Sequence, residues 1–105
     1  MNDSLTRLEA TIAARRGADP ASSYVAKLSA AGRAKIAQKV GEEAVETVIA
    51  AMAGDPAKLT SEAADLMFHL LILLADGGIT LADVAAELDR REGVSGLTEK
   101  AARGE

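Results

Sequence analysis

The chain has 105 residues, 49% of them apolar, and its only aromatic side chains are Tyr24 and Phe68. Many alanines and leucines with so few aromatics are typical of packed helices, so we expect one all-α domain rather than a β-sandwich. A net charge of −4 argues against nucleic acid or an acidic membrane surface as a partner, and the absence of cysteine excludes disulfides and cysteine-based zinc sites.

Apolar residues recur along the chain at helical spacing, and Gly, Pro and Asp residues interrupt the pattern. The predicted helical segments cover, in chain order, residues 4–17, 24–28, 34–53, 60–75 and 80–91. They predict a four-to-five-helix bundle within residues 1–92. We expect residues 93–105 to form a flexible tail or a short helix that orders only on a partner. The N-terminus lacks the basic and apolar regions of a signal peptide, so we expect a cytoplasmic protein.

Two of the predicted helices carry apolar side chains along one face, which we interpret as the face turned toward the core. These faces consist of Val45, Val48, Ile49 and Met52 in the helix over 34–53, and of Leu81, Val84, Ala85 and Leu88 in the last helix. Thr80 and Asp83 have the spacing of a capping box at the start of that last helix. Gly41 is costly in mid-helix, so we expect it to allow close approach of another helix.

The helix over 60–75 is apolar on nearly all sides, because only His69 interrupts the run from Leu66 to Leu74. A small monomer has too few neighbours to cover such a helix. We therefore predict a homo-oligomer, most simply a dimer, that buries this helix between subunits. The apolar run is too short to span a bilayer, so we expect no membrane partner.

Two acidic motifs lie one predicted helix apart, Glu42-Glu43-x-x-Glu46 and Glu62-x-x-Asp65. Residues three or four positions apart share a helix face, and antiparallel packing of the two helices would bring the motifs together. Close carboxylates then repel by about 4 kcal/mol per pair at 4 Å and an effective dielectric constant of 20. A bound Mg²⁺ or Mn²⁺ ion, each of which prefers oxygen ligands, would remove that repulsion.

The same acids have a simpler interpretation. A lone Glu-Glu-x-x-Glu motif is more often a solvated helix face than a metal site. Glu62 and Asp65 would also lie in the first turns of their predicted helix, where acidic side chains favour the helix dipole. A second acidic pair at matching spacing, on a helix that must otherwise be buried, favours the metal site.

Basic residues just before the first acidic motif are candidates for substrate phosphates. Lys35 and Lys39 stand one helical turn apart, and they could bind phosphates or pair with glutamates one turn away. Lys27 and Arg33 are further candidates of the same kind. They would give a locally positive region in an acidic chain.

His69 and Tyr24 are the other candidates for substrate contacts. His69 lies four residues after Asp65, so it could support a carboxylate, contact a substrate phosphate, or be a hydrogen-bonded core histidine. Tyr24 could stack on a base or ribose, or it could pack in the core. The local sequence leaves these alternatives open.

Three segments together resemble the phosphoribosyl-ATP pyrophosphatase family of the all-α nucleoside triphosphate pyrophosphatase superfamily. They are Ser-Tyr-x-x-Lys-Leu at 23–28, Lys-Val-Gly-Glu-Glu-Ala-Val-Glu at 39–46 and Glu-Ala-Ala-Asp-Leu-Met-Phe-His-Leu-Leu at 62–71. The acidic residues alone are typical of the superfamily, whereas their combination with the flanking residues indicates this family. Phe68 departs from the pattern, since a tyrosine is common at its position.

The resemblance implies Mg²⁺-dependent hydrolysis of phosphoribosyl-ATP to phosphoribosyl-AMP and pyrophosphate, the second step of L-histidine biosynthesis. Mn²⁺ is a candidate substitute for Mg²⁺. The residues implied as metal ligands are Glu43, Glu46, Glu62 and Asp65. Glu42 would add a ligand or orient the attacking water, so the implied catalytic residues are Glu42, Glu43 and Glu46.

Two other functions remain open from the sequence. A house-cleaning pyrophosphatase acting on non-standard nucleoside triphosphates would use the same carboxylates, although the segment Ser23-Tyr24 argues against it. A non-catalytic helical dimerisation module would carry the acids only as surface charge.

Overall fold

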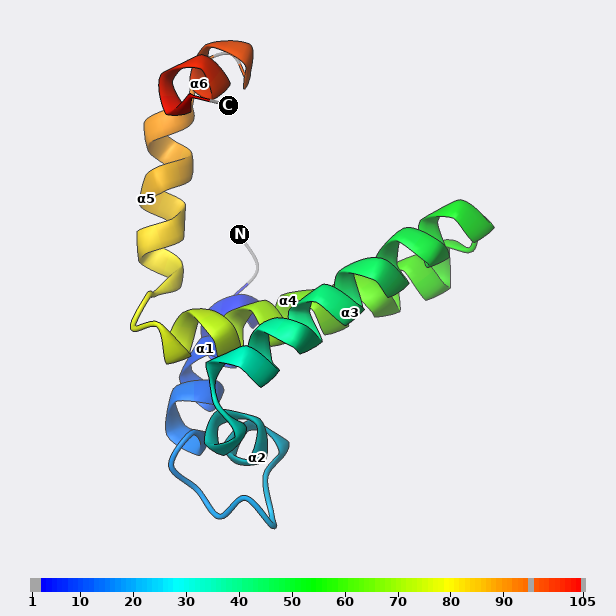
Figure 1. Ribbon diagram of the computed structural model, residues 1–105, viewed down its shortest axis with the longest axis vertical. Coiled ribbons are helices and arrows are strands. Elements are labelled where there is room, and N and C mark those ends of the chain that lie inside the picture. Colours follow the sequence, from blue (N-terminus) through cyan, green and yellow to red (C-terminus); the bar gives the residue numbers. More distant parts are fainter. Residues whose placement is uncertain (1–2, 95, 105) are drawn as a thin grey trace.

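A computed structural model describes residues 3–94 and 96–104 of the chain, and within them all regular structure is helical (Figure 1). The six helices of these described residues are α1 Ser4–Arg15, α2 Tyr24–Ala31, α3 Arg33–Ala53, α4 Pro56–Asp76, α5 Leu81–Arg91 and α6 Gly96–Arg103. The all-α prediction is therefore confirmed, with one helix more than the four or five expected. The additional helix, α6, lies in the segment predicted as a tail or short helix.

The two longest helices, α3 and α4, form an antiparallel hairpin (Figure 1). Only Gly54 and Asp55 connect them. Gly54 adopts a left-handed φ of 71°, which ends α3 in a conformation that other residues rarely adopt. Asp55 then caps α4 by accepting a hydrogen bond from the backbone N–H of Lys58 at 3.1 Å, and Pro56 occupies the first helical turn.

The predicted start of this helix at Thr60 is therefore wrong, because the Asp-Pro pair begins it at Pro56. The earlier start changes the position of the second acidic motif within the helix. Glu62 and Asp65 lie beyond the first turn of α4, where the helix dipole has little effect on a carboxylate. The dipole thus gives no reason for their presence.

The hydrophobic core lies at the open end of the hairpin, where α1 and α2 pack against the start of α3 and the end of α4 (Figure 1). Its buried side chains are Ile12, Val25, Leu28, Ile36, Leu71 and Ile72. Asp76 ties this end together, since it lies 2.7 Å from Nε of Arg33 and 3.6 Å from the guanidinium of Arg16. Arg33 is thereby engaged in the fold, which argues against the phosphate contact considered for it.

The apolar face of α3 does not turn toward the core of this chain. The residues that α3 buries are Ile36, Glu43 and Ala50. The predicted inner face, Val45, Val48, Ile49 and Met52, is 58 to 82% exposed. Periodicity identified the apolar face correctly, but α4 packs on a different face of the helix. An added Cβ on Gly41 would also meet nothing within 4 Å, so that glycine does not serve close packing within this chain.

Helix α5 projects away from the hairpin, and none of its residues is buried (Figure 1). The predicted inner face of this helix is therefore wrong for the single chain, except that Leu81 packs against the edge of the core. The predicted capping box is present, because Thr80 and Asp83 each accept a hydrogen bond from the other's backbone N–H. Oε2 of Glu9 accepts a further bond from the N–H of Leu81 at 2.7 Å, which anchors α5 to α1.

No single helix within the described ranges has both the length and the apolar character needed to cross a membrane. The pair α4 and α5, which is bent by 104°, meets those criteria only when its two members are taken together.

Candidate metal centre

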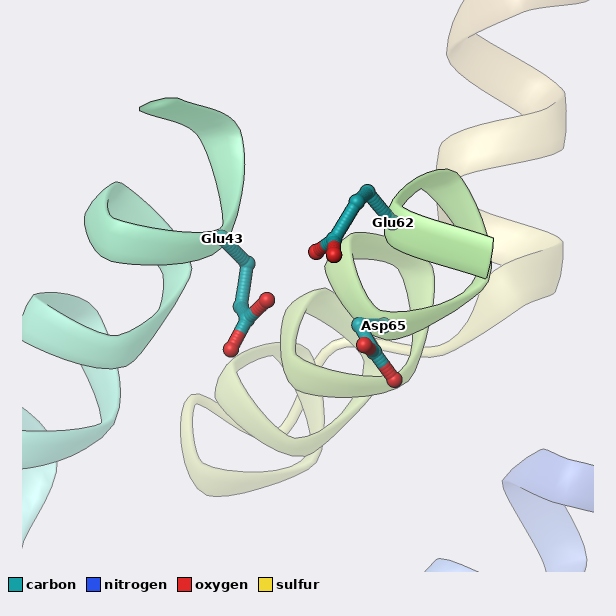
Figure 2. A group of neighbouring side chains, drawn as sticks. All are labelled: Glu43, Glu62 and Asp65. Atoms are coloured by element: carbon teal, nitrogen blue, oxygen red, sulfur yellow. The ribbon is translucent and has the colours of Figure 1, made fainter. Parts of the chain in front are cut away.

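Helices α3 and α4 bring three carboxylates together across the hairpin, those of Glu43, Glu62 and Asp65 (Figure 2). One oxygen atom from each lies within 4.8 Å of the others. Glu43 is only 8% exposed, Glu62 is half-buried and Asp65 is exposed. The group therefore has a buried side at Glu43 and an open side at Asp65. Three of the four predicted metal ligands meet here, and their role as ligands stays a prediction.

Two oxygen atoms of this group lack partners. Among the described residues, Oε2 of Glu43 and Oε2 of Glu62 are buried and accept no hydrogen bond. A buried carboxylate oxygen without a donor loses its hydration and gains nothing in return. Burial accordingly raises the pKa of both carboxyl groups, and the nearby carboxylate of Glu46 raises both pKa values further. A hard divalent cation would satisfy both oxygens, so these residues fit Mg²⁺ or Mn²⁺.

Glu46, the fourth predicted ligand, lies beside the three carboxylates rather than among them. Its carboxylate is close enough to Glu43 and Glu62 to raise the pKa of each. The side chain is exposed and lines a surface hollow with Gly41, Glu42 and Val45. Glu46 therefore occupies the solvent side of the group, where it could complete a metal site or contact a bound water.

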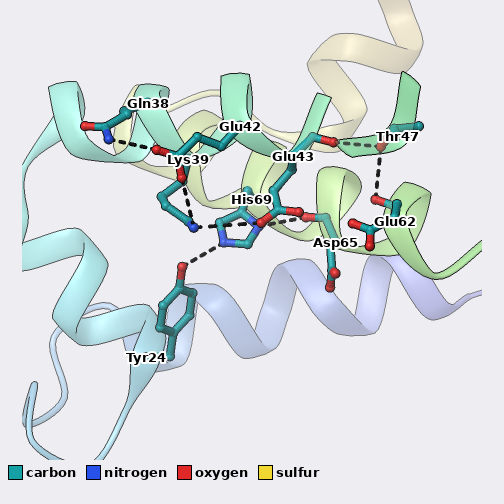
Figure 3. A network of polar contacts seen from close by, with 9 residues as sticks. All are labelled: Tyr24, Gln38, Lys39, Glu42, Glu43, Thr47, Glu62, Asp65 and His69. Carbon is teal, nitrogen blue, oxygen red and sulfur yellow. Dashed lines mark hydrogen bonds and ion pairs between the residues drawn. The ribbon is translucent and has the colours of Figure 1, made fainter. Parts of the chain in front are cut away.

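Glu42, the remaining acidic candidate, points away from the three carboxylates (Figure 3). Its oxygens accept hydrogen bonds from Nε2 of Gln38 at 2.8 Å and from Nζ of Lys39 at 3.2 Å. These two bonds lower the pKa of Glu42 and so keep the carboxylate ionised. Lys39 also lies 3.8 Å from Oε1 of Glu43, so its ammonium group connects the exposed glutamate with the buried one.

His69 is a hydrogen-bonded buried histidine that links α4 to α2 (Figure 3). Its Nδ1 lies 2.7 Å from the backbone carbonyl oxygen of Asp65. A carbonyl can only accept, so Nδ1 must donate, and Nε2 of the neutral ring then accepts from the Tyr24 hydroxyl at 2.8 Å. Both ring nitrogens are thus engaged, which favours the core and supporting roles over a phosphate contact.

Thr47 is a residue near the carboxylates that sequence reasoning missed. Its hydroxyl donates to the backbone carbonyl of Glu43 at 2.8 Å and also lies 3.3 Å from the carbonyl of Glu62 (Figure 3). It therefore joins α3 to α4 at the level of the carboxylates. Its position one helical turn after Glu43 was the available signal, but the contact to Glu62 depends on how the hairpin packs.

A cavity of about 280 Å³ lies next to the carboxylate group. Its lining residues are Tyr24, Lys27, Leu28, Ala31, Lys35, Lys39 and Glu42. It brings together four of the candidate substrate contacts named from the sequence, Tyr24, Lys27, Lys35 and Lys39. Tyr24 is 47% exposed, and its ring stacks on that of Phe68, with ring centroids 6.1 Å apart.

Comparison with known proteins identifies the family to which the chain belongs. Residues 5–92 match the sequence profile of the phosphoribosyl-ATP pyrophosphohydrolase family. A phosphoribosyl-ATP pyrophosphatase of Rhizorhabdus wittichii is 70% identical over 98% of this chain and 97% of its own length. A protein of the same name from Erythrobacter litoralis is 65% identical over 98% of this chain and 99% of its own length. The chain therefore belongs to the phosphoribosyl-ATP pyrophosphohydrolase family, a family of hydrolases.

Proposed function

We propose that this protein hydrolyses phosphoribosyl-ATP to phosphoribosyl-AMP and pyrophosphate in a Mg²⁺-dependent reaction, the second step of L-histidine biosynthesis. The family match and the names of the relatives support the substrate. The observation that carries the metal dependence is the pair of buried, unpartnered oxygens of Glu43 and Glu62 beside Asp65. Membership of a hydrolase family also argues against a purely structural module.

The chain's own residues divide the work in this proposal. Glu43, Glu62 and Asp65 hold the metal ion, and Glu46 approaches from the solvent side. When bound, Mg²⁺ would neutralise phosphate charge and acidify a coordinated water. Glu42 is held ionised by its two hydrogen-bond donors, and its remaining lone pairs can accept a hydrogen bond from a water molecule at the mouth of the site and so orient that water.

We also propose that the protein is cytoplasmic and, as a separate point, that it forms a homodimer through α3. The support is the exposed apolar face of α3 formed by Val45, Val48, Ile49 and Met52. Contiguous apolar surface of this kind is uncommon on a monomer and typically marks a contact. The sequence led us to expect the dimer contact on α4, whereas in the structure the apolar residues of α3 are more exposed than those of α4. Val45 shares its surface hollow with Glu42 and Glu46, so a second subunit on this face would lie next to the carboxylates.

Pyrophosphate release from phosphoribosyl-ATP, measured with and without Mg²⁺, tests the proposal. The wild-type protein should release pyrophosphate only with the metal. Glu43→Gln and Asp65→Asn should each lower kcat/KM by at least about 100-fold, since each removes a charged ligand oxygen. Circular dichroism should show an unchanged helical content.

Glu92→Gln is the matched control, because Glu92 is an exposed residue at the end of α5 and lies far along the chain from the carboxylates. It should keep wild-type activity. Failure of the wild-type protein to release pyrophosphate would disprove the proposed reaction. Full activity of both site variants would instead show that the metal-site assignment is wrong.

A further inference from the structure

The cavity beside the carboxylates has one wall from α2 and one from α3. Its α2 wall consists of Tyr24, Lys27, Leu28 and Ala31, which recur at helical spacing on one face. Its α3 wall consists of Lys35, Lys39 and Glu42. The cavity thus combines apolar side chains and an exposed tyrosine with three ammonium groups and one carboxylate, that of Glu42, which Lys39 engages. This lining suits a ligand that carries both an aromatic ring and negative charge.

Two of these lysines form no salt bridge among the described residues, although the charge of Lys35 helps to lower the pKa of Glu42 in the same wall. Lys39 is engaged by Glu42 and Glu43. Lys27 and Lys35, by contrast, form no ion pair with any part of the chain that the structure describes. In a chain with a net charge of −4, two unpaired cations on facing walls of one cavity are an arrangement that suits an anion.

The position of these lysines separates them from the metal site. At about 1.5 Å of helical rise per residue, Lys35 lies roughly 12 Å along α3 from Glu43. Lys39 stands between Lys35 and Glu43 along α3, so an anion held between Lys27 and Lys35 can be a different group of the ligand from the phosphates held at the carboxylates. Phosphoribosyl-ATP has such a second anion, because its phosphoribosyl group carries a monophosphate on the far side of the adenine from the triphosphate.

We propose that Lys27 and Lys35 form a second anion subsite that binds the monophosphate of the phosphoribosyl group and so selects phosphoribosyl-ATP over ATP. The proposal rests on the proposed function. Tyr24 cannot take this role, because its hydroxyl proton is donated to His69 and its oxygen faces a ligand only as an acceptor. ATP lacks the phosphoribosyl phosphate, so it has no group that would pair with the two lysines at this subsite.

The test is the double variant Lys27→Ala/Lys35→Ala, with Lys100→Ala on the exposed face of α6 as the control. We expect the KM of the double alanine variant for phosphoribosyl-ATP to rise roughly 10- to 100-fold, because the charge-assisted hydrogen bonds to the monophosphate are lost. The KM of the control should stay at the wild-type value. The inhibition constant of ATP as a competitive inhibitor should not change, and kcat should change much less than KM. The double variant Lys27→Arg/Lys35→Arg should restore most of the affinity. Retained stabilisation by Mg²⁺ in thermal unfolding would show that the fold and the metal site are intact.

Each other outcome has a definite meaning. If KM for phosphoribosyl-ATP and the inhibition constant of ATP rise together, the lysines bind the triphosphate and the proposed subsite is wrong. If neither constant changes in an active enzyme, these lysines bind no part of the substrate. Absence of pyrophosphate release from the wild-type protein would contradict the proposed function itself, which distinguishes the two failures.

Discussion

The hydroxyl oxygen of Tyr24 and Nε2 of His69 lie 2.8 Å apart, although 45 positions separate the two residues in the sequence. The opposite nitrogen of the same ring bonds the backbone carbonyl of Asp65. The imidazole of His69 therefore connects two helices. It joins Tyr24, the first residue of α2 and part of the cavity wall, to α4, which carries Glu62 and Asp65. This bond makes a specific prediction about stability.

Tyr24→Phe should destabilise the fold by about 1–3 kcal/mol, because it leaves a buried acceptor nitrogen of His69 without a donor while the ring keeps its packing on Phe68. Urea unfolding of Tyr24→Phe, His69→Phe and the double variant measures the coupling. The two losses should add to more than the loss in the double variant. Strict additivity would show that the bond does not contribute to stability.

In the metal-free protein, the buried carboxyl groups of Glu43 and Glu62 should contribute less to the free energy of unfolding at neutral pH than in mild acid. Burial and Glu46 raise the pKa of Glu43 and Glu62 above the ordinary value of 4.5 in the folded state. The folded state then binds protons more tightly than the unfolded state does. Their contribution to stability is therefore present below pH 4.5 and is lost as pH rises through the raised pKa values.

Glu62→Gln isolates this effect, because it removes one such charge with little change in shape. With a chelator present, the variant should be more stable than the wild type at neutral pH, and the gain should disappear toward about pH 4. Adding Mg²⁺ should reverse the order, since the ion stabilises only a folded state that can bind it. The measurement is urea unfolding across this pH range. A variant that is less stable than the wild type without metal would contradict the assignment of unfavourable burial.

The exposed face of α3 predicts that Ile49→Asp converts a dimer into a monomer. Ile49 is 59% exposed in the single chain, so the substitution should change monomer stability little. A charge buried in a dimer contact is costly, and dissociation avoids that cost. Sedimentation velocity gives the mass of each form, with Leu97→Asp on α6, where Leu97 is 83% exposed, as the control. A wild-type monomer, or a dimer that tolerates the aspartate, would show that this face is not the subunit contact.

Gly41→Ala should stabilise the chain by up to about 1 kcal/mol, because alanine favours the helix and the added Cβ meets nothing within 4 Å. Thermal unfolding of the wild type and the variant measures the change. The opposite outcome would be a variant that is less stable than the wild type and no longer forms a dimer. It would indicate that a second subunit packs closely against Gly41, which lines the same hollow as Val45 and Glu46.

The sequence alone determined the features that depend on a few neighbouring residues. The helical class follows from apolar periodicity, and the capping box of Thr80 and Asp83 forms as its spacing predicts. The proximity of the two acidic motifs could be predicted from helical spacing and from the short connection between the helices, because consecutive helices joined by a short connection pack antiparallel. The start of α4 is also encoded locally, since Asp55 followed by Pro56 is a typical N-cap and first helical residue.

Only the tertiary structure decided which helix faces are covered. Glu42 and Glu43 differ by about 100° around α3, yet one is exposed beside Gln38 and the other is buried against α4. The bond from Tyr24 to His69 and the meeting of Lys27 and Lys35 at one cavity likewise depend on how α2 docks. Periodicity fixes the relative directions of side chains on one helix. Burial and pairing depend on which distant segment packs there, and no local pattern encodes that choice.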